Sequence, residues 1–281
     1  MMKLAATISA TPAIINAQDL MRKQPRDFDS NGVSIRYLVA GKGEPVILLH
    51  GFIFSMGPAW ITGGFFDVLS QTNRVVAMDL RGHGRSGKPH DPTRYGLEMV
   101  NDVVRLMDYL HFDKAHLVGY SLGGILACKC LDVASPRLQS VVMGGAGWVR
   151  EGDSTHRSWT PLAEMLERVR PGETLSSHFW PNPNTLPPRE VQDLVNSNDP
   201  VALAGVARGM LDVTVQENVL QANSVPILAI CGERDPAKES VLAMKSVAQN
   251  LTVRVVPGFD HNTLPASKEF GEAVRNFVSA R

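Results

Sequence analysis

Residues 115–123 read Ala-His-Leu-Val-Gly-Tyr-Ser-Leu-Gly, and this stretch carries the strongest structural signal in the chain. The apolar run Ala115 to Val118 is typical of a buried strand, and Ile125 to Val133 is typical of a helix. Between them lies the pattern G-x-S-x-G, which places a serine on a sharp turn from strand to helix. Gly119 and Gly123 carry no side chains that would obstruct Ser121, so its hydroxyl is expected to be exposed at the edge of a sheet.

Strand-like and helix-like segments alternate on both sides of this turn. A hairpin is predicted near the start, because Asn31-Gly32 is a favoured two-residue turn between strand-like runs at Arg26 to Asp29 and Val33 to Val39. Further strands are expected at Pro45–Leu49, Arg74–Met78, Leu138–Met143, Pro226–Cys231 and Leu251–Val256. Helices are expected at Ile61–Ser70, Tyr95–Leu110 and Ala266–Val278. The alternation predicts an α/β fold with a mostly parallel sheet flanked by helices.

One long interval interrupts the alternation. Between Gly147 and Ser224 the chain is rich in proline and has helical stretches near Leu162–Val169, Glu190–Asn196 and Val201–Leu211. This pattern predicts a helical cap, residues 147–224, inserted after the sixth strand. The α/β core then comprises residues 26–146 and 225–281, preceded by an N-terminal segment, residues 1–25.

A serine hydroxyl needs a base, usually a histidine whose second nitrogen is held by a carboxylate. Asp235 and His261 each follow a predicted strand, so they are expected at the same sheet edge as Ser121. The order Ser, Asp, His along the chain fits this architecture. Glu233 and Asp260 are neighbouring carboxylates that compete with Asp235, and their alternative role is loop capping.

Two backbone amides are predicted to form an oxyanion hole. The N–H of Leu122 directly follows the nucleophile, and the N–H of Phe52 lies on the loop after the Pro45 strand, where Gly51 permits a close approach. His50, beside this loop, is interpreted as a residue that braces it by hydrogen bonding.

Four aromatic residues are candidates for contact with a substrate. Tyr120 lies within the turn, Phe54 follows the proposed oxyanion loop, and Trp148 and Trp159 belong to the predicted cap. Packing in the core is the alternative for each of them. The polar loop 79–86 lacks the ending of a phosphate-binding loop and is interpreted as structural support.

The composition excludes several classes of partner. Lys plus Arg and Asp plus Glu both number 28, so no net field attracts nucleic acid, and a small-molecule partner is expected. No stretch after the N-terminus approaches the length of a membrane span, and no metal-ligand spacing is present. Residues 1–25 resemble a weak secretory signal, but polar residues dilute it, which favours a cytoplasmic location over export.

The combined motifs resemble the α/β-hydrolase superfamily, specifically its capped branch of serine esterases and C–C bond hydrolases. They are His50-Gly51-Phe52, residues 79–86, residues 119–124, residues 232–235 and residues 258–261. The resemblance implies an eight-stranded sheet and no cofactor. It also implies that Ser121 is the nucleophile, that His261 is the general base and then acid, and that Asp235 orients His261.

The residues within and beside these motifs reduce the number of enzyme classes that this chain resembles. Epoxide hydrolases and haloalkane dehalogenases of this branch carry aspartate where this chain has Ser121, and C–C bond hydrolases commonly have tryptophan where it has Asn262. Cofactor-free haloperoxidases usually have methionine at the position of Leu122. A carboxylesterase acting through an acyl-enzyme is the resulting prediction. C–C bond hydrolysis by the same triad, or a ligand receptor with little or no turnover, remain alternatives.

Overall fold

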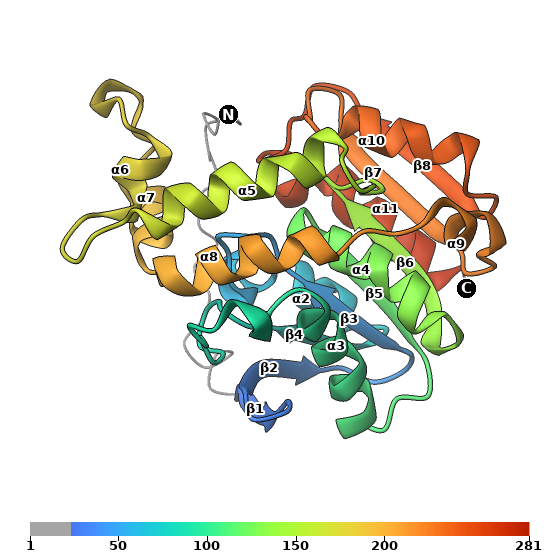
Figure 1. Ribbon diagram of the computed structural model, residues 1–281. Coiled ribbons are helices and arrows are strands. Elements are labelled where there is room, and N and C mark those ends of the chain that lie inside the picture. Colours follow the sequence, from blue (N-terminus) through green and yellow to red (C-terminus); the bar gives the residue numbers. More distant parts are fainter. Residues whose placement is uncertain (1–23, 281) are drawn as a thin grey trace.

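The computed structural model describes residues 24–280, which fold around one eight-stranded sheet (Figure 1). The strands lie in the order β1-β2-β4-β3-β5-β6-β7-β8. Only β2 runs antiparallel to its neighbours, so the predicted mostly parallel sheet is confirmed. Almost all of the predicted N-terminal segment lies outside the described residues. The strands are β1 Arg26–Asp29, β2 Ser34–Ala40, β3 Pro45–Leu49, β4 Arg74–Met78, β5 Ala115–Tyr120, β6 Leu138–Gly144, β7 Ile227–Gly232 and β8 Leu251–Val256.

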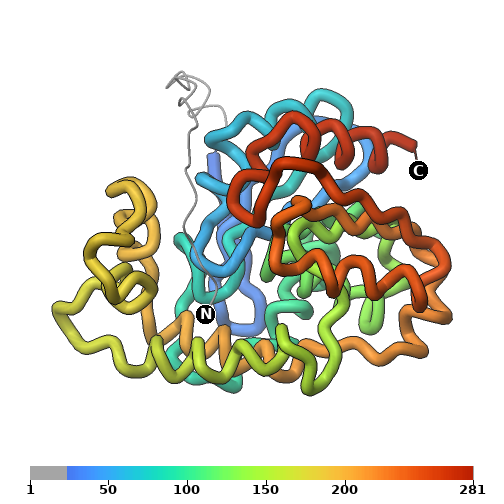
Figure 2. Tube along the Cα trace, turned by 90° about the horizontal axis from the view of Figure 1, so that it is seen from above, coloured from blue at the N-terminus to red at the C-terminus, as the bar shows by residue number. Residues whose placement is uncertain are grey.

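Helices cover both faces of the sheet because its central strands are apolar on both sides. In β3, Ile47 and Leu49 face one hydrophobic core and Val46 and Leu48 face the other, and all four are fully buried. The first core includes α3 (Leu97–Tyr109) and α4 (Leu122–Val133); the second includes α2 (Phe65–Leu69) and α11 (Lys268–Ser279). In Figure 2, α11 (red) lies on the side of the molecule opposite α5 and α8.

The predicted hairpin between β1 and β2 is confirmed. Asn31 and Gly32 both have positive φ angles, 56° and 77°, which this tight turn requires. Ser30 and Val33 exchange backbone hydrogen bonds on either side of the turn.

The segment between β6 and β7 is helical, as predicted for an insertion after the sixth strand. It contains α5 (Ser154–Glu167), α6 (Leu175–Phe179), α7 (Arg189–Asn196), α8 (Pro200–Gly209) and α9 (Glu217–Ala222). Helix α9 lies beside α4, whereas α6 and α7 project from the side of the molecule (Figure 1). Helices α5 to α8 are called the cap below. After β7 follows α10 (Lys238–Ala243).

Two helices differ from the sequence prediction. The expected helix 61–70 is divided into a π-helical turn, Gly57–Ile61, and α2, because Gly64 takes a φ of 76° between them. Helix α5 begins at Ser154 rather than Leu162, since the Asp153 carboxylate accepts the His156 N–H at its start. Pro161 is tolerated inside α5, where its ring lies on the exposed face.

The base of the cap is closed by hydrogen bonds between its departing and returning chains. The indole N–H of Trp148 donates to the carbonyl of Val215 at 2.6 Å, and the Val215 N–H donates to the carbonyl of Val149 at 3.2 Å. Trp148 is buried, so its N–H is satisfied within the fold.

Helix α8 docks on the core through glycines. A Cβ at Gly205 would lie 2.6 Å from the Tyr95 ring, and one at Gly209 would lie 2.3 Å from the Gly96 nitrogen. The Tyr95 hydroxyl donates to the carbonyl of Pro89 at 2.6 Å, which fixes the ring. Larger residues on α8 would therefore separate the cap from the core.

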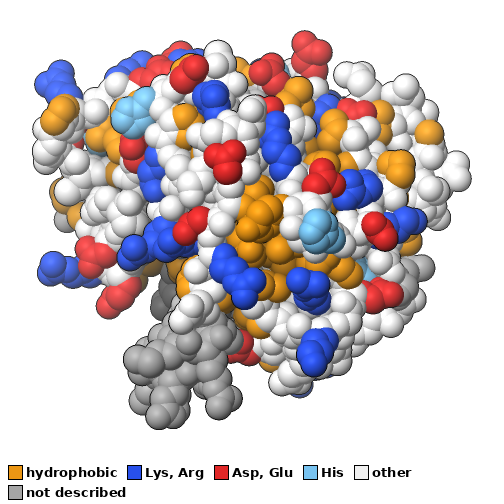
Figure 3. Space-filling model, turned by 90° about the horizontal axis from the view of Figure 1, so that it is seen from below, with side chains coloured by type: hydrophobic (Ala, Val, Ile, Leu, Met, Phe, Trp, Pro, Cys, Tyr) orange, Lys and Arg blue, Asp and Glu red, His pale blue; other side chains and the backbone are white. Residues whose placement is uncertain are grey.

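The described surface carries mixed charge. The face in Figure 3 shows Lys and Arg side chains among Asp and Glu side chains around an apolar area. Within residues 24–280, no helix combines the length and apolar character needed to cross a bilayer.

Candidate active site

Three residues predicted from separate motifs meet at the carboxyl ends of the parallel strands. His261 Nε2 lies 3.0 Å from Ser121 Oγ, and His261 Nδ1 lies 3.1 Å from both carboxylate oxygens of Asp235. Ser121 follows β5, Asp235 follows β7 and His261 follows β8. Parallel strands bring their carboxyl ends to one edge, and this places the three side chains in contact.

The turn at Ser121 has a geometry that few sequences allow. Ser121 adopts φ 54° and ψ −117°, a conformation that costs a non-glycine residue about 1–3 kcal/mol. A Cβ at Gly119 would lie 2.1 Å from the Gly123 carbonyl oxygen, and a Cβ at Gly123 would lie 2.1 Å from that of Leu49. Both glycines are therefore required for α4 to pack against β5 and β3.

His261 is held by one contact to its ring and one to its backbone. The Asp235 side chain is fully buried and accepts the Ala237 N–H at 2.9 Å in addition to contacting His261. The Tyr120 hydroxyl donates to the His261 carbonyl at 2.7 Å. The His261 side chain is 16% exposed, so one side of the ring remains open toward solvent or a ligand.

The two amides predicted for the oxyanion hole belong to the residue after Ser121 and to the loop after β3. Leu122 N–H opens α4, and Phe52 N–H belongs to the loop after β3; among the described residues neither donates a hydrogen bond. A Cβ at Gly51 would be 3.5 Å from Ser121 Cβ, so this loop passes close to the nucleophile. Free amide donors at this point can stabilise a developing oxyanion.

The four aromatic candidates occupy different environments. Phe54 is half-buried and near Gly51, beside Ser121, and Trp159 of α5 lies with its ring 5.7 Å from that of Phe52. Tyr120 and Trp148 have packing and hydrogen-bonding partners within the fold, and substrate contact by either stays a prediction. Tyr120 packs on the glycines that end β6 and bonds to the His261 backbone, and Trp148 closes the base of the cap.

The competing carboxylates serve their own loops. Asp260 Oδ1 accepts the N–H groups of Asn262 and Thr263 at 3.0 Å each, and Glu233 accepts the Gly258 N–H at 3.2 Å. Neither contacts His261 through its side chain among the described residues. The sequence did not reveal the support that Tyr120 gives, because only the fold brings residues 141 positions apart together.

The loop 79–86 supports the oxyanion loop, as the sequence indicated. The Asp79 carboxylate accepts the N–H groups of Met56 and Arg85 at 2.8 Å each. His83 Nε2 contacts the Phe52 carbonyl. These bonds tie the loop after β4 to the loop after β3.

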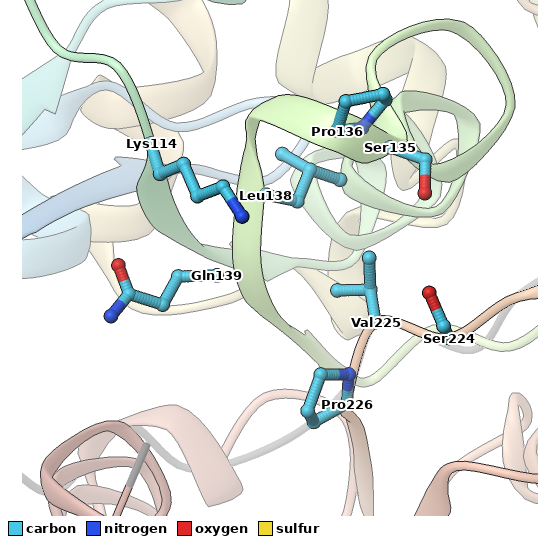
Figure 4. A pocket seen from close by; sticks show the side chains of 8 residues that line it. All are labelled: Lys114, Ser135, Pro136, Leu138, Gln139, Ser224, Val225 and Pro226. Atoms are coloured by element: carbon cyan, nitrogen blue, oxygen red, sulfur yellow. The ribbon is translucent and has the colours of Figure 1, made fainter.

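A hollow of about 470 Å³ lies away from the three residues. It is lined by residues that precede or begin β5, β6 and β7, including Lys114, Leu138 and Pro226 (Figure 4). The amino ends of these strands are opposite the edge that carries Ser121, so this hollow is separate from the candidate active site. No group of three or more potential metal ligands occurs within residues 24–280.

Because two histidines are buried, we expect the free energy of unfolding to fall in acid. Burial lowers the pKa of His50 to about 4, and burial together with the neighbouring His50 lowers the pKa of His83 to about 3. Below pH 6.5 the unfolded chain takes up protons at these positions and the folded chain does not, so stability is lost as the pH falls.

We expect the change in unfolding free energy between pH 7.5 and pH 5 to be smaller by about 2 kcal/mol in His83→Gln than in the unmodified protein. Urea denaturation at the two pH values measures this difference. Equal pH dependence in both proteins would contradict a neutral, buried His83.

Comparison with known proteins identifies related sequences and folds. The pattern of the family described as alpha/beta hydrolase fold matches residues 44–174. A relative from Bacillus subtilis (strain 168) carries the provisional name 2-succinyl-6-hydroxy-2,4-cyclohexadiene-1-carboxylate synthase. It is 26% identical over 279 residues, covering 88% of this chain and 96% of the relative.

Two further similarities have different extents. The 2-hydroxy-6-oxo-6-(2'-aminophenyl)hexa-2,4-dienoic acid hydrolase of Metapseudomonas resinovorans is 35% identical over 133 residues, covering 45% of this chain and 44% of the relative. A thermophilic esterase from Thermogutta terrifontis, solved with malate bound, has a TM-score of 0.73 at 23% identity. That likeness covers 92% of this chain and 98% of the esterase, and it shows a shared fold.

Proposed function

We propose that this chain is a serine hydrolase of the α/β-hydrolase superfamily that cleaves a small-molecule carboxylic ester through an acyl-enzyme. The continuous contact from Ser121 through His261 to Asp235 is the observation that carries the proposal. Each group has a distinct role in acyl transfer.

The reaction begins at Ser121. His261 Nε2, 3.0 Å away, takes the Ser121 proton as the oxygen attacks the ester carbonyl. The carbonyl electron pair moves onto oxygen, where the Phe52 and Leu122 amides stabilise the negative charge. His261 then protonates the departing alcohol. Water, deprotonated by His261, attacks the acyl-enzyme and releases the acid and free Ser121.

Asp235 acts through His261. Its carboxylate faces Nδ1, so the Nδ1–H tautomer is favoured and Nε2 is left free to accept the serine proton. The carboxylate also stabilises the imidazolium that forms during attack. Substrate contact is proposed for Phe54, whose ring approaches Gly51, and for Trp159, whose ring lies 5.7 Å from that of Phe52.

C–C bond hydrolysis by the same three residues is the second candidate. The Metapseudomonas relative is named for hydrolysis of a 2-hydroxy-6-oxo-dienoic acid, and its similarity to this chain is the observation that favours this candidate. Asn262 after the histidine is the sequence feature that favours ester cleavage.

A substrate panel tests the proposed function. We expect p-nitrophenyl esters of increasing acyl length to be hydrolysed, with faster turnover than a vinylogous diketone of the meta-cleavage type. A fluorophosphonate probe should label the unmodified protein. Faster cleavage of the diketone would favour the second candidate, and binding without turnover or labelling would favour a receptor.

A further inference from the structure

Two buried histidines lie behind the oxyanion loop and have no part in the reaction steps above. His50 and His83 are both fully buried, and their rings meet edge to face with centroids 5.2 Å apart. Phe52 lies beside them, with its ring 6.0 Å from that of His83. Buried polar atoms generally have hydrogen-bond partners, and the ring nitrogens of both histidines do.

His50 holds the peptide that carries the Phe52 N–H. Leu80 N–H donates to His50 Nε2 at 3.0 Å, so the ring proton resides on Nδ1, which lies 2.8 Å from the Gly51 carbonyl oxygen. Phe54 N–H donates to the same oxygen at 3.1 Å. The Gly51 carbonyl and the Phe52 N–H belong to one trans peptide and point in opposite directions. Fixing the carbonyl therefore fixes the direction of the Phe52 N–H.

His83 holds the next peptide. Its Nε2 contacts the Phe52 carbonyl, and its Nδ1 lies 3.0 Å from the Arg81 carbonyl. With a proton on Nε2, His83 donates to Phe52. The two peptide groups that flank the Phe52 Cα are thus each held by one buried histidine.

We propose that His50 and His83 are positioning residues that aim the Phe52 N–H at the oxyanion, with His50 acting through Nδ1 and His83 through Nε2. This inference rests on the proposed function, because it assigns the orientation of an amide used in that reaction. Displacement of one oxyanion donor typically lowers the rate by about 10²–10³-fold.

Substitution by asparagine or by glutamine tests the roles of the two ring nitrogens separately. The Asn amide lies near the position of Nδ1, and the longer Gln amide reaches that of Nε2. His50→Asn keeps the donor to Gly51, whereas His50→Gln keeps only the acceptor for Leu80. At His83 the assignment is reversed, because Gln keeps the donor to the Phe52 carbonyl, whereas the shorter Asn amide reaches only the Arg81 carbonyl.

Labelling by a fluorophosphonate measures the effect without a known substrate, since the phosphoryl oxygen must enter the same oxyanion hole. We expect His50→Asn to react about tenfold or more faster than His50→Gln. We expect His83→Gln to react faster than His83→Asn by a similar factor. The final extent of labelling reports the folded fraction, and the rate constant reports the orientation of the amide.

His116 provides a matched control at the other edge of the sheet. It is fully buried, and it contacts Ser140 Oγ through Nδ1 at 2.7 Å and Glu44 through Nε2 at 3.3 Å. His116→Asn and His116→Gln remove a buried imidazole without touching the oxyanion loop. Their labelling rates should stay within about twofold of the unmodified protein.

The proposal is supported if the Asn variant reacts faster than the Gln variant at position 50 and the Gln variant reacts faster than the Asn variant at position 83. Equal rates for Asn and Gln at both positions, or the same preferred residue at both, would overturn it. If the His50 variants do not fold, the His83 pair decides alone. Absence of labelling in the unmodified protein would instead refute the proposed function, so the two failures are distinct.

Discussion

Replacing Ser121 by alanine is expected to lower kcat by about 10⁴–10⁶-fold and to abolish fluorophosphonate labelling. The variant loses the oxygen that lies 3.0 Å from His261 Nε2, so no covalent intermediate can form. Because the side chain only becomes smaller at a half-buried position, the thermal midpoint should remain close to that of the unmodified protein. Ester hydrolysis, mass spectrometry of the labelled protein and thermal denaturation measure the three outcomes.

Ser246→Ala serves as the control for this prediction. Ser246 is exposed and, within residues 24–280, its hydroxyl bonds only to the Ala243 carbonyl, so its loss should leave turnover and labelling unchanged. Labelling of Ser121→Ala at another residue, with turnover retained, would contradict the assignment of the nucleophile.

Replacing Asp235 by asparagine is expected to lower kcat by about 10⁴-fold while KM changes little. The amide of asparagine can donate to His261 Nδ1 and thereby favours the tautomer with the proton on Nε2, which cannot accept the Ser121 proton. A residue with only a structural role would instead lower stability and the active fraction. The split between kcat and KM, together with a titration of active sites, distinguishes these roles.

Glu233→Gln is the matched control for Asp235. Glu233 lies on the same loop, is exposed and, in the described part of the chain, accepts only the Gly258 N–H, so its variant should keep kcat within about threefold. A larger loss in Glu233→Gln than in Asp235→Asn would show that the carboxylate had been assigned to the wrong residue.

The sequence predicted the parts of the fold that depend on local pattern. The apolar runs of β3 and β4 have the predicted bounds, because strands buried on both faces leave an uninterrupted apolar signature. The edge strand β8 also has the predicted bounds, but its Thr252 and Arg254 are exposed. The meeting of Ser121, Asp235 and His261 followed from their positions after parallel strands. Their catalytic roles remain predictions that the variants above test.

Other features depend on contacts that a linear pattern does not contain. The sequence predicts a helix only near Leu162–Val169, but the Asp153 cap and an exposed position for Pro161 let α5 begin at Ser154. The packing of the Tyr120 ring against Gly144 and Gly145 at the end of β6 also depends on the fold. The boundaries predicted for the cap at residues 147 and 224 also stay a prediction.

Because the glycines of α8 pack tightly against Tyr95, the cap helices differ in how well they tolerate substitution. Gly205 and Gly209 leave no room for a side chain against the core, so variation there would shift the whole cap. Helices α6 and α7 contact mainly each other and α5. Substitutions at residues 175–196 would therefore leave the docking of α8 on the core intact, whereas larger residues at Gly205 or Gly209 would displace the cap.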